Sequence, residues 1–293
     1  MVRINLFNNE NKAETNTKST PKSDIKGVIL AGGKGLRLHP LTKVTNKHLL
    51  PVGREPMIFN PIKKLVEAGV SEILIITSTE QMGSIVNLLG SGSEFGCNFT
   101  YKVQEEAAGI AHALALAEDF AQGKKIIVIL GDNITTGSLK AFADKFRTQG
   151  HGARVLLKKV EDPNRYGVAS IDQEQVIEIE EKPKNPKSNF AVIGYYMYDH
   201  NVFNVIRNLQ PSARGEYEIT DVNNAYIKEG KLQYDVLDAP WTDAGTFESL
   251  HHASQMLMKE STNQPASSLV TKEQLTDMIS TFEQKINELK KHL

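Results

Sequence analysis

The sequence KGVILAGGKGLRL spans Lys26–Leu38 and decides the fold of this chain. Lys26–Ala31 is largely apolar and stops at a pair of glycines, a pattern typical of a strand buried in a parallel sheet. Glycine lets backbone N–H groups approach a phosphate closely, and Lys34 and Arg37 add positive charge. The segment therefore predicts a strand followed by an anion-binding loop, although a turn without a ligand is the alternative for any glycine-rich loop.

Two common phosphate-binding motifs fit this loop poorly. A P-loop ends in Gly-Lys-Ser or Gly-Lys-Thr, and the sequence contains neither. The dinucleotide fingerprint has a third glycine where this chain has Leu38, although Glu55 stands near the distance expected for the acidic residue of that fingerprint. An NAD(P)-dependent oxidoreductase is therefore a weakened alternative.

The rest of the first half alternates between strand and helix patterns. Strands are predicted at 72–77, 99–104 and 124–130, and helices at 56–68, 83–89 and 109–120. This rhythm favours an α/β fold with a parallel sheet and helices on both faces.

The second half has more strand per residue. Strands are predicted at 153–160, 166–172, 176–181, 190–199 and 231–238, and helices at 200–209, 219–230 and 247–259. We expect part of it to be an antiparallel addition to the same sheet or a subdomain lying over it.

The length of 293 residues allows two domains or one large α/β domain. Residues 1–24 are polar and predict a disordered leader, 25–259 a catalytic domain, and 260–270 a polar linker. Residues 271–293 predict an amphipathic helix with a heptad seam, which could dock on the parent domain, self-associate into a homo-oligomer, or fray. The seam consists of Leu275, Ile279, Phe282, Ile286, Leu289 and Leu293.

Composition excludes several classes of protein. Cys97 is the single cysteine, so neither an intrachain disulfide nor a Cys-rich zinc module can form. The 34 Lys and Arg against 35 Asp and Glu give no sign of a nucleic-acid partner. No apolar run approaches the roughly 18 residues that span a bilayer. The N-terminus also lacks a secretory signal, so we expect a cytoplasmic protein without a membrane partner.

The near-neutral charge of the whole chain is not shared by every segment. No acidic residue lies between Asp24 and Glu55, whereas six basic residues do, namely Lys26, Lys34, Arg37, Lys43, Lys47 and Arg54. The window points to an anionic ligand.

Four further positions combine charge with a strand end or a turn. Lys47 closes the acid-free window, Asp132 follows the most apolar strand, Glu181 ends another strand, and Asp243 follows the only tryptophan, Trp241. Each also has a structural interpretation. In the same order, the four residues could be a surface lysine with a buried stem, an aspartate that caps a turn, a glutamate at a solvated strand end, and the N-cap of a helix.

Together these segments resemble the sugar-1-phosphate nucleotidylyltransferases over about residues 26–259. The motifs are LAGGKGLRLHPLT (30–42), NKHLLPVGREPMI (46–58), VQEEAAGIAHAL (103–114), ILGDN (129–133), RYGV (165–168), EEKPKNPKSNFAVIGYY (180–196), SARGEYEITD (212–221) and WTDAGTFESL (241–250). The resemblance implies a three-layer α/β/α Rossmann-like fold with a mostly parallel mixed sheet. It also implies Mg²⁺-dependent transfer of a nucleotidyl group from dTTP to glucose-1-phosphate, giving dTDP-glucose and pyrophosphate.

The resemblance further implies roles for individual residues. The nucleotide-binding set is Leu30, Gly32, Gly33, Gly35, Arg37, Gln104 and Gly109. The substrate-binding set is Asn133, Gly167, Glu181, Lys182, Val192 and Arg214, of which Lys182 and Arg214 would bind the phosphate of the sugar-1-phosphate. The catalytic residues would be Arg37, Lys47, Asp132 and Lys182. The ligands of Mg²⁺ would be Asp132 and Asp243.

Three positions depart from the family pattern. Leu36 stands where Thr or Ser is usual, Ala108 where longer members have Asp, and His112 where Gln is frequent. We expect His112 to be a packed polar residue on a helix face. UTP, another sugar-1-phosphate, and a non-catalytic sugar-nucleotide sensor with the same fold stay open as alternatives.

Overall fold

The computed structural model describes residues 24–263, and β1 (Ile25–Ala31) lies in the middle of its main sheet. The parallel strands β4 (Glu72–Ser78), β5 (Asn98–Gln104) and β6 (Lys125–Leu130) give the order β5-β4-β1-β6. The chain therefore adds two strands on one side of β1 and then crosses to the other. Open α/β sheets bind ligands at such a reversal, at the carboxyl ends of the strands.

Antiparallel strands extend the same sheet beyond β6. The strand β11 (Phe190–Tyr198) pairs with β6, with β8 (Ala153–Lys159) and with β9 (Gly167–Asp172), and β10 (Gln175–Glu181) follows β9. The strand β12 (Leu232–Val236) lies parallel to β8. The second half of the chain therefore extends the same sheet, as the first of the two predicted alternatives, and does not form a subdomain lying over it.

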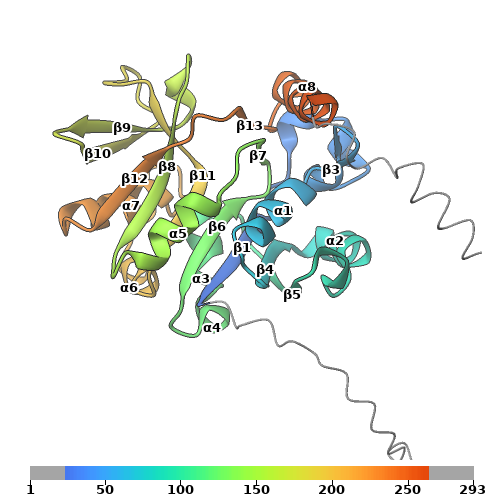
Figure 1. Ribbon diagram of the computed structural model, residues 1–293, viewed down its shortest axis with the longest axis horizontal. Coiled ribbons are helices and arrows are strands. Elements are labelled where there is room, and N and C mark those ends of the chain that lie inside the picture. The colour runs from blue at the N-terminus through green and yellow to red at the C-terminus, as the bar shows by residue number, and fades with distance from the viewer. Residues whose placement is uncertain (1–23, 264–293) are drawn as a thin grey trace, which may run out of the picture.

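Helices cover both faces of this sheet (Figure 1). Side chains alternate along β1, so Val28 and Leu30 join one buried cluster while Ile29 and Ala31 join the other. The first cluster packs against α3 (Ile110–Ala115), α6 (Val202–Arg207) and α7 (Ile219–Lys228). The second packs against α1 (Phe59–Glu67), α2 (Met82–Leu89) and α5 (Lys140–Thr148). The expected three-layer α/β/α fold with a mixed sheet is confirmed.

A third, smaller core lies beside the sheet and was not predicted. The helix α8 (Phe247–Asn263) packs there near two short strand pairs, β2 (Pro51–Val52) with β3 (Glu55–Pro56), and β7 (Asn133–Thr135) with β13 (Trp241–Asp243). Strands of two or three residues are too short for a hydrophobic period to register in sequence.

Several predicted boundaries need correction. The helix expected at 56–68 begins at Phe59, because Pro56 pairs with Pro51 in a hairpin. The helix expected at 109–120 is divided into α3 and α4 (Glu118–Ala121). Helix α8 continues to Asn263, into the stretch predicted to be a linker. Residues 1–23 of the leader predicted at 1–24, and the heptad helix predicted at 271–293, lie outside the described residues. Within residues 24–263, no helix has both the length and the apolarity to cross a bilayer.

Candidate active site

Two cavities adjoin at the carboxyl ends of β1 and β6. The glycine chamber has a volume of about 300 Å³ and is lined by the loop after β1, by Gln104 and by Gly109. The carboxylate chamber has a volume of about 450 Å³ and lies over β9, β10 and β11. The residues lining both are Ile110, Leu130, Asp132 and Glu216. Asp132 therefore stands where the two chambers meet.

The structure brings nearly all predicted site residues to these chambers. The glycine chamber is lined by Leu30, Gly32, Gly33, Lys47, Gln104 and Gly109. The carboxylate chamber is lined by Arg37, Asn133, Gly167, Glu181, Lys182, Val192, Arg214 and Asp243. Gly35 lines neither: its positive φ of 63° begins the 3-10 turn Leu36–Leu38. Gly35 therefore shapes the loop, and its place among the nucleotide contacts stays a prediction.

Lys47 and Asp132 form an ion pair inside the site. The distance from Lys47 Nζ to Asp132 Oδ2 is 2.6 Å, and both side chains are largely buried. Burial alone would raise the pKa of the Asp132 carboxyl. The positive charge of Lys47 and the hydrogen bonds from Lys47 and Asn133 outweigh burial and hold that pKa well below its usual range. Lys47 is therefore no surface lysine, and Asp132 is an anion at the junction of the chambers.

His48 is a buried neutral neighbour of this pair. Burial, with the positive charge of Lys47, lowers the pKa of its imidazole to about 3. Its Nδ1 lies 2.9 Å from Asn46 Oδ1, and its ring packs so close to Gly131 that a Cβ there would meet Cδ2 at 2.7 Å. A glycine before Asp132 is therefore required by the packing of His48.

Asp243 is brought to Asp132 by a strand pair. Asp243 on β13 lies opposite Asn133 on β7, and Ala244 N donates to Asp132 O at 2.8 Å. Burial raises the pKa of the Asp243 carboxyl, and the negative charge of Asp132 raises it further, against the opposing charge of Arg165. Each carboxylate therefore lies within the electrostatic influence of the other.

The side chain of Asp243 does not cap α8. It accepts hydrogen bonds from Tyr166 Oη at 3.1 Å and from Arg165 Nη2 at 3.4 Å. Thr246 takes the capping role, because its Oγ1 accepts from Ser249 N at 3.2 Å. The helix N-cap interpretation of Asp243 is therefore wrong.

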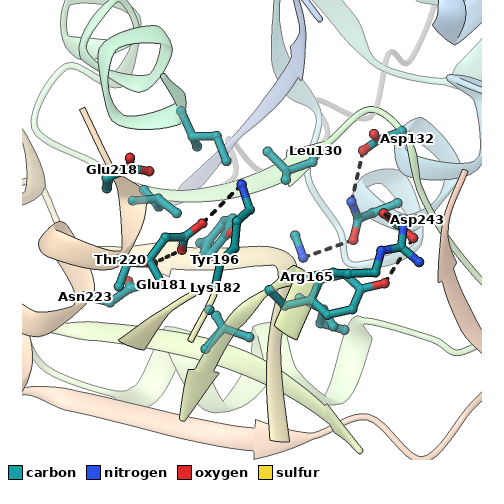
Figure 2. Close-up of a pocket in the computed structure, with 18 of the residues that line it drawn as sticks. Leu130, Asp132, Arg165, Glu181, Lys182, Tyr196, Glu218, Thr220, Asn223 and Asp243 are labelled. Carbon is teal, nitrogen blue, oxygen red and sulfur yellow. Dashed lines mark hydrogen bonds and ion pairs between the residues drawn. The ribbon is translucent and has the colours of Figure 1, made fainter. Parts of the chain in front are cut away.

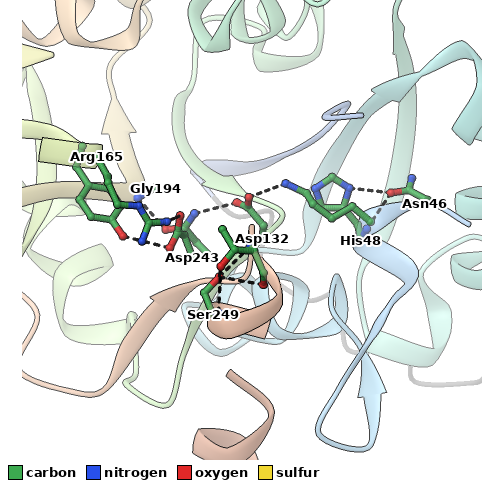
Figure 3. Close-up of polar contacts among 11 residues, drawn as sticks. Asn46, His48, Asp132, Arg165, Gly194, Asp243 and Ser249 are labelled. Atoms are coloured by element: carbon green, nitrogen blue, oxygen red, sulfur yellow. Dashed lines mark hydrogen bonds and ion pairs between the residues drawn. The ribbon is translucent and has the colours of Figure 1, made fainter. Parts of the chain in front are cut away.

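Asn133 connects the strands around the junction, and Figure 3 shows two of its hydrogen-bond partners, Asp132 and Gly194. Its Oδ1 accepts from Gly194 N at 3.0 Å and from Trp241 Nε1 at 2.9 Å, and its Nδ2 donates to Asp132 Oδ1 at 3.0 Å. The side chain lines the carboxylate chamber, and one of these three hydrogen bonds orients Asp132 while the other two join Asn133 to β11 and β13.

Cations and carboxylates face one another at the other end of the carboxylate chamber (Figure 2). Lys182 has a positive φ of 47°, an uncommon backbone conformation for a residue with a side chain, and its Nζ lies 3.6 Å from Glu181 Oε1. Arg214 Nη2 donates to both oxygens of Glu218 at 2.9 Å. Backbone strain of this kind concentrates at functional sites.

Gln104 is oriented by its neighbours in the glycine chamber. Its Nε2 donates to Gly109 O at 3.5 Å and lies 3.2 Å from His112 Nδ1. A carbonyl oxygen only accepts, so Nε2 faces Gly109, and Oε1 lies toward Gly32, where a Cβ would come within 3.0 Å of it. His112 was expected to be a packed polar residue on a helix face; it lies on α3 and contacts Gln104 directly.

The side chain of Arg37 lies in the wall of the carboxylate chamber and forms no hydrogen bond there with the described residues. Its Nη2 lies 2.8 Å from where a Cβ on Gly245 would stand. The guanidinium is therefore free, as far as the described residues go, to bind an anion.

Several residues of the carboxylate chamber were not among the predicted site residues, and five of them have polar side chains that bear on the argument below. These are Arg165, Tyr166, Glu218, Thr220 and Asn223. Thr220 and Asn223 are buried polar residues three positions apart on α7. That spacing on an otherwise apolar helix face was the available signal.

The carboxylates offer a small donor set for a metal ion. Within the described part of the chain, no group of three or more His, Cys, Asp and Glu residues could hold one. Asp132 and Asp243 alone would need further oxygens from a ligand or from water, as Mg²⁺ commonly has when bound with phosphates. The raised pKa of Asp243 beside anionic Asp132 fits a site that a cation would stabilise.

Comparisons with known proteins agree on one family. A family model described as nucleotidyl transferase matches residues 26–260. The chain is 42% identical to a glucose-1-phosphate thymidylyltransferase of Neisseria meningitidis, covering 80% of this chain and 82% of that protein. It is 44% identical to one of Xanthomonas campestris, covering 79% and 80%.

Solved structures are similar in the same way. A protein of Bacillus anthracis assigned as a glucose-1-phosphate thymidylyltransferase, in complex with sucrose, matches with a TM-score of 0.77 and 55% identity, covering 79% of this chain and 94% of that one. A UDP-glucose pyrophosphorylase in complex with UDP-glucose matches with a TM-score of 0.72 and 25% identity, covering 80% and 99%.

Proposed function

The chain belongs to the nucleotidyl transferase family, and on that premise we propose that it is a glucose-1-phosphate thymidylyltransferase. The reaction joins dTTP and glucose-1-phosphate into dTDP-glucose and releases pyrophosphate. The observation that carries the proposal is the pair of chambers meeting at Asp132, one built from glycines and Gln104, the other from cations and carboxylates.

The chemistry needs no general base. The nucleophile is a phosphate oxygen of glucose-1-phosphate, already about dianionic at neutral pH because the second pKa of a phosphate monoester is near 6. It forms a bond to the α-phosphorus of dTTP, while the bond from that phosphorus to the bridging oxygen breaks and pyrophosphate leaves with the electron pair. The site accordingly offers no Ser–His or Cys–His pair among the residues that line the two chambers.

The main barrier is repulsion between two anionic substrates, so cations are the catalytic groups. In this proposal Arg37 binds the triphosphate and Lys47, at the junction, lies along the reacting phosphates. Lys182 and Arg214 bind the sugar phosphate. In the structure described, Lys47 forms a 2.6 Å ion pair with Asp132. When the substrates bind, Lys47 would leave Asp132 and bind phosphate oxygens.

The glycine chamber suits a pyrimidine base with a protonated ring nitrogen. Because Gln104 directs Nε2 toward Gly109 and His112, its Oε1 is the group left to accept a hydrogen bond. Thymine and uracil have an N–H at ring position 3, whereas cytosine has an acceptor there. The backbone at Leu30 and Gly32 would supply further contacts to the base.

We further propose Mg²⁺ as the metal, held by Asp132 and Asp243. When bound with the phosphates, Mg²⁺ would neutralise charge that develops on the leaving pyrophosphate. The chain's own part is to orient the two carboxylates, through Asn133 for Asp132 and through Tyr166 for Asp243. A cytoplasmic location and a homo-oligomeric state are parts of the same proposal, as is a catalytic domain over residues 25–259.

Pyrophosphate release across dTTP, UTP, dCTP, ATP and GTP, each with a panel of sugar-1-phosphates, tests this function. We expect dTTP with glucose-1-phosphate to give the highest kcat/KM, and EDTA to abolish turnover until Mg²⁺ is restored. Higher kcat/KM with UTP, or with another sugar-1-phosphate, would replace the proposed substrates. No release with any pair would indicate a sensor without catalytic activity.

A further inference from the structure

The carboxylate chamber has a buried amide in its wall with an unused hydrogen-bond donor. Asn223 on α7 is 1% exposed and lines the chamber. Its Oδ1 accepts a hydrogen bond of 2.7 Å from the hydroxyl of Tyr198, while its Nδ2 has no partner in the described part of the chain. Burying a donor without an acceptor is costly, so such a group in a cavity wall points to whatever fills the cavity.

Tyr198 bonds Oδ1 of the Asn223 amide and leaves Nδ2 without a partner in the described residues. Tyr198 on β11 is fully buried, and burial, with Tyr196 and Tyr226 nearby, raises the pKa of its hydroxyl well above 10. The hydroxyl therefore keeps a proton that it can donate, and in the structure it donates to Oδ1. The Nδ2 group is thereby the one available to a ligand.

The adjacent wall has the complementary polarity (Figure 2). Thr220, one helical turn before Asn223, donates to Glu181 Oε2 at 2.6 Å. The carboxylate of Glu181 and the oxygen of Thr220 then retain lone pairs that accept hydrogen bonds. This wall therefore offers acceptors beside one donor, and a hydroxyl group, which both donates and accepts, satisfies both kinds.

We propose that Asn223 donates through Nδ2 to a ring hydroxyl of the bound sugar and so rejects sugars that lack this hydroxyl. The inference rests on the proposed function, because it needs a sugar-1-phosphate in the carboxylate chamber. A site that hydrogen-bonds a substrate hydroxyl discriminates strongly against the deoxy analogue, since its own polar groups are otherwise left unpaired. The rival occupant is a water molecule, which would satisfy Nδ2 whatever the sugar.

The test compares glucose-1-phosphate with its monodeoxy analogues. The full chain is assayed with saturating dTTP, as wild type and as Asn223→Ala. In wild type we expect one deoxy analogue to have a kcat/KM lower than that of glucose-1-phosphate by about 10-fold or more. In Asn223→Ala we expect glucose-1-phosphate to lose most of this advantage over that analogue, and the ranking of the other analogues to stay unchanged.

Two further variants separate binding from structural damage. Tyr198→Phe removes the bond that orients the amide, so we expect a smaller loss of the same discrimination, seen in KM more than in kcat. Asn224→Ala is the matched control, because both groups of that amide bond the backbone of Ile179 and so join α7 to β10. It should lower the melting temperature while leaving the sugar ratios unchanged.

The outcomes distinguish the inference from the function on which it rests. Normal turnover with unchanged ratios in Asn223→Ala, or an equal loss for every sugar, would overturn the inference alone. Absence of turnover in wild type would overturn the proposed function as well. If Asn223→Ala fails to fold, Tyr198→Phe decides: wild-type ratios in that variant contradict the proposal.

Discussion

Asp132 shows how a single residue gains its role from its neighbours. An aspartate after an apolar strand was visible in the sequence, and so was Lys47, 85 positions earlier in the chain. What the sequence did not contain was the 2.6 Å contact between them, or the amide of Asn133 that orients the carboxylate. These depend on how β1, β6 and β7 lie together.

We expect Asp132→Asn and Asp243→Asn each to lower kcat by about 100-fold or more, the scale of losing a main electrostatic stabiliser. Each substitution keeps the shape of the side chain and removes the charge that would hold Mg²⁺. Initial rates at several Mg²⁺ concentrations measure the effect. Asp144→Asn is the control, since that carboxylate lies on the surface of α5 and pairs with Lys140. Near-normal kcat in both site variants would remove the metal assignment.

His112 supports a prediction about base selection. Replacing it with Leu removes one of the two acceptors that hold Gln104 Nε2, so the amide is freer to turn its donor toward the base. We expect His112→Leu to reduce the preference for dTTP over dCTP by about 10-fold. The ratio of the two kcat/KM values measures it, with the exposed His151→Leu as control. An unchanged ratio would mean that Gly109 alone orients Gln104.

Asn223 marks the limit of prediction from sequence at this scale. Its importance depends on a donor, Nδ2, that lacks an acceptor, and on Tyr198, which lies 25 positions away on another element. Only the packing of α7 against β11 reveals both. By contrast, Gly32, Lys47 and Asp132 could be predicted, because each follows a strand or closes a charge window that is continuous in sequence.

At the scale of elements, the loops before α3 and α7 are joined by backbone hydrogen bonds. Tyr217 N donates to Ala108 O at 2.8 Å, and Ala111 N donates to Tyr217 O at 3.1 Å. The loop before α3 borders the glycine chamber, and the loop before α7 contains Arg214. Movement of one loop should therefore affect the other.

Gly109→Ala tests this connection. Gly109 has a φ of 102°, and a Cβ there would lie 2.5 Å from Tyr217 O. We expect the variant to lower the free energy of unfolding by about 2 kcal/mol and to raise KM for both substrates, because both loops must move. Chemical denaturation and the two KM values check it. Gly150→Ala is the control, since a Cβ at Gly150 meets nothing within 4 Å. A rise in KM for dTTP alone would contradict the connection.

Strands and helices were predicted correctly where the apolar run was long, and they were missed where it was only two or three residues long. The strands β1, β4 and β6 were predicted closely, since each is a run of six or seven mostly buried residues. The pair β7 and β13 was missed, although it brings Asp243 opposite Asn133. Three-residue strands are defined by their partner, and that partner lies about a hundred residues away in the chain.

At the scale of the whole molecule, the near-neutral charge conceals a local imbalance. The six basic residues of the acid-free window include Arg37 and Lys47, both of which line the chambers. Most carboxylates of the site come instead from strands and loops beyond residue 130. The site is therefore a junction between a cationic N-terminal segment and a more acidic second half. It lies where the order of the strands in the sheet reverses.

The C-terminal segment supports a prediction about assembly. Helix α8 belongs to the third core, since Ala253 and Met256 are buried there, so the natural boundary for a deletion is Asn263. The heptad seam predicted from Leu275 to Leu293 lies beyond the described residues. We expect deletion of 264–293 to leave kcat/KM unchanged and to lower the mass measured by light scattering, because a heptad seam buries its apolar side chains by association. A lower melting temperature with an unchanged mass would indicate that the segment docks on its own domain. Unchanged mass and unchanged melting temperature together would exclude both roles.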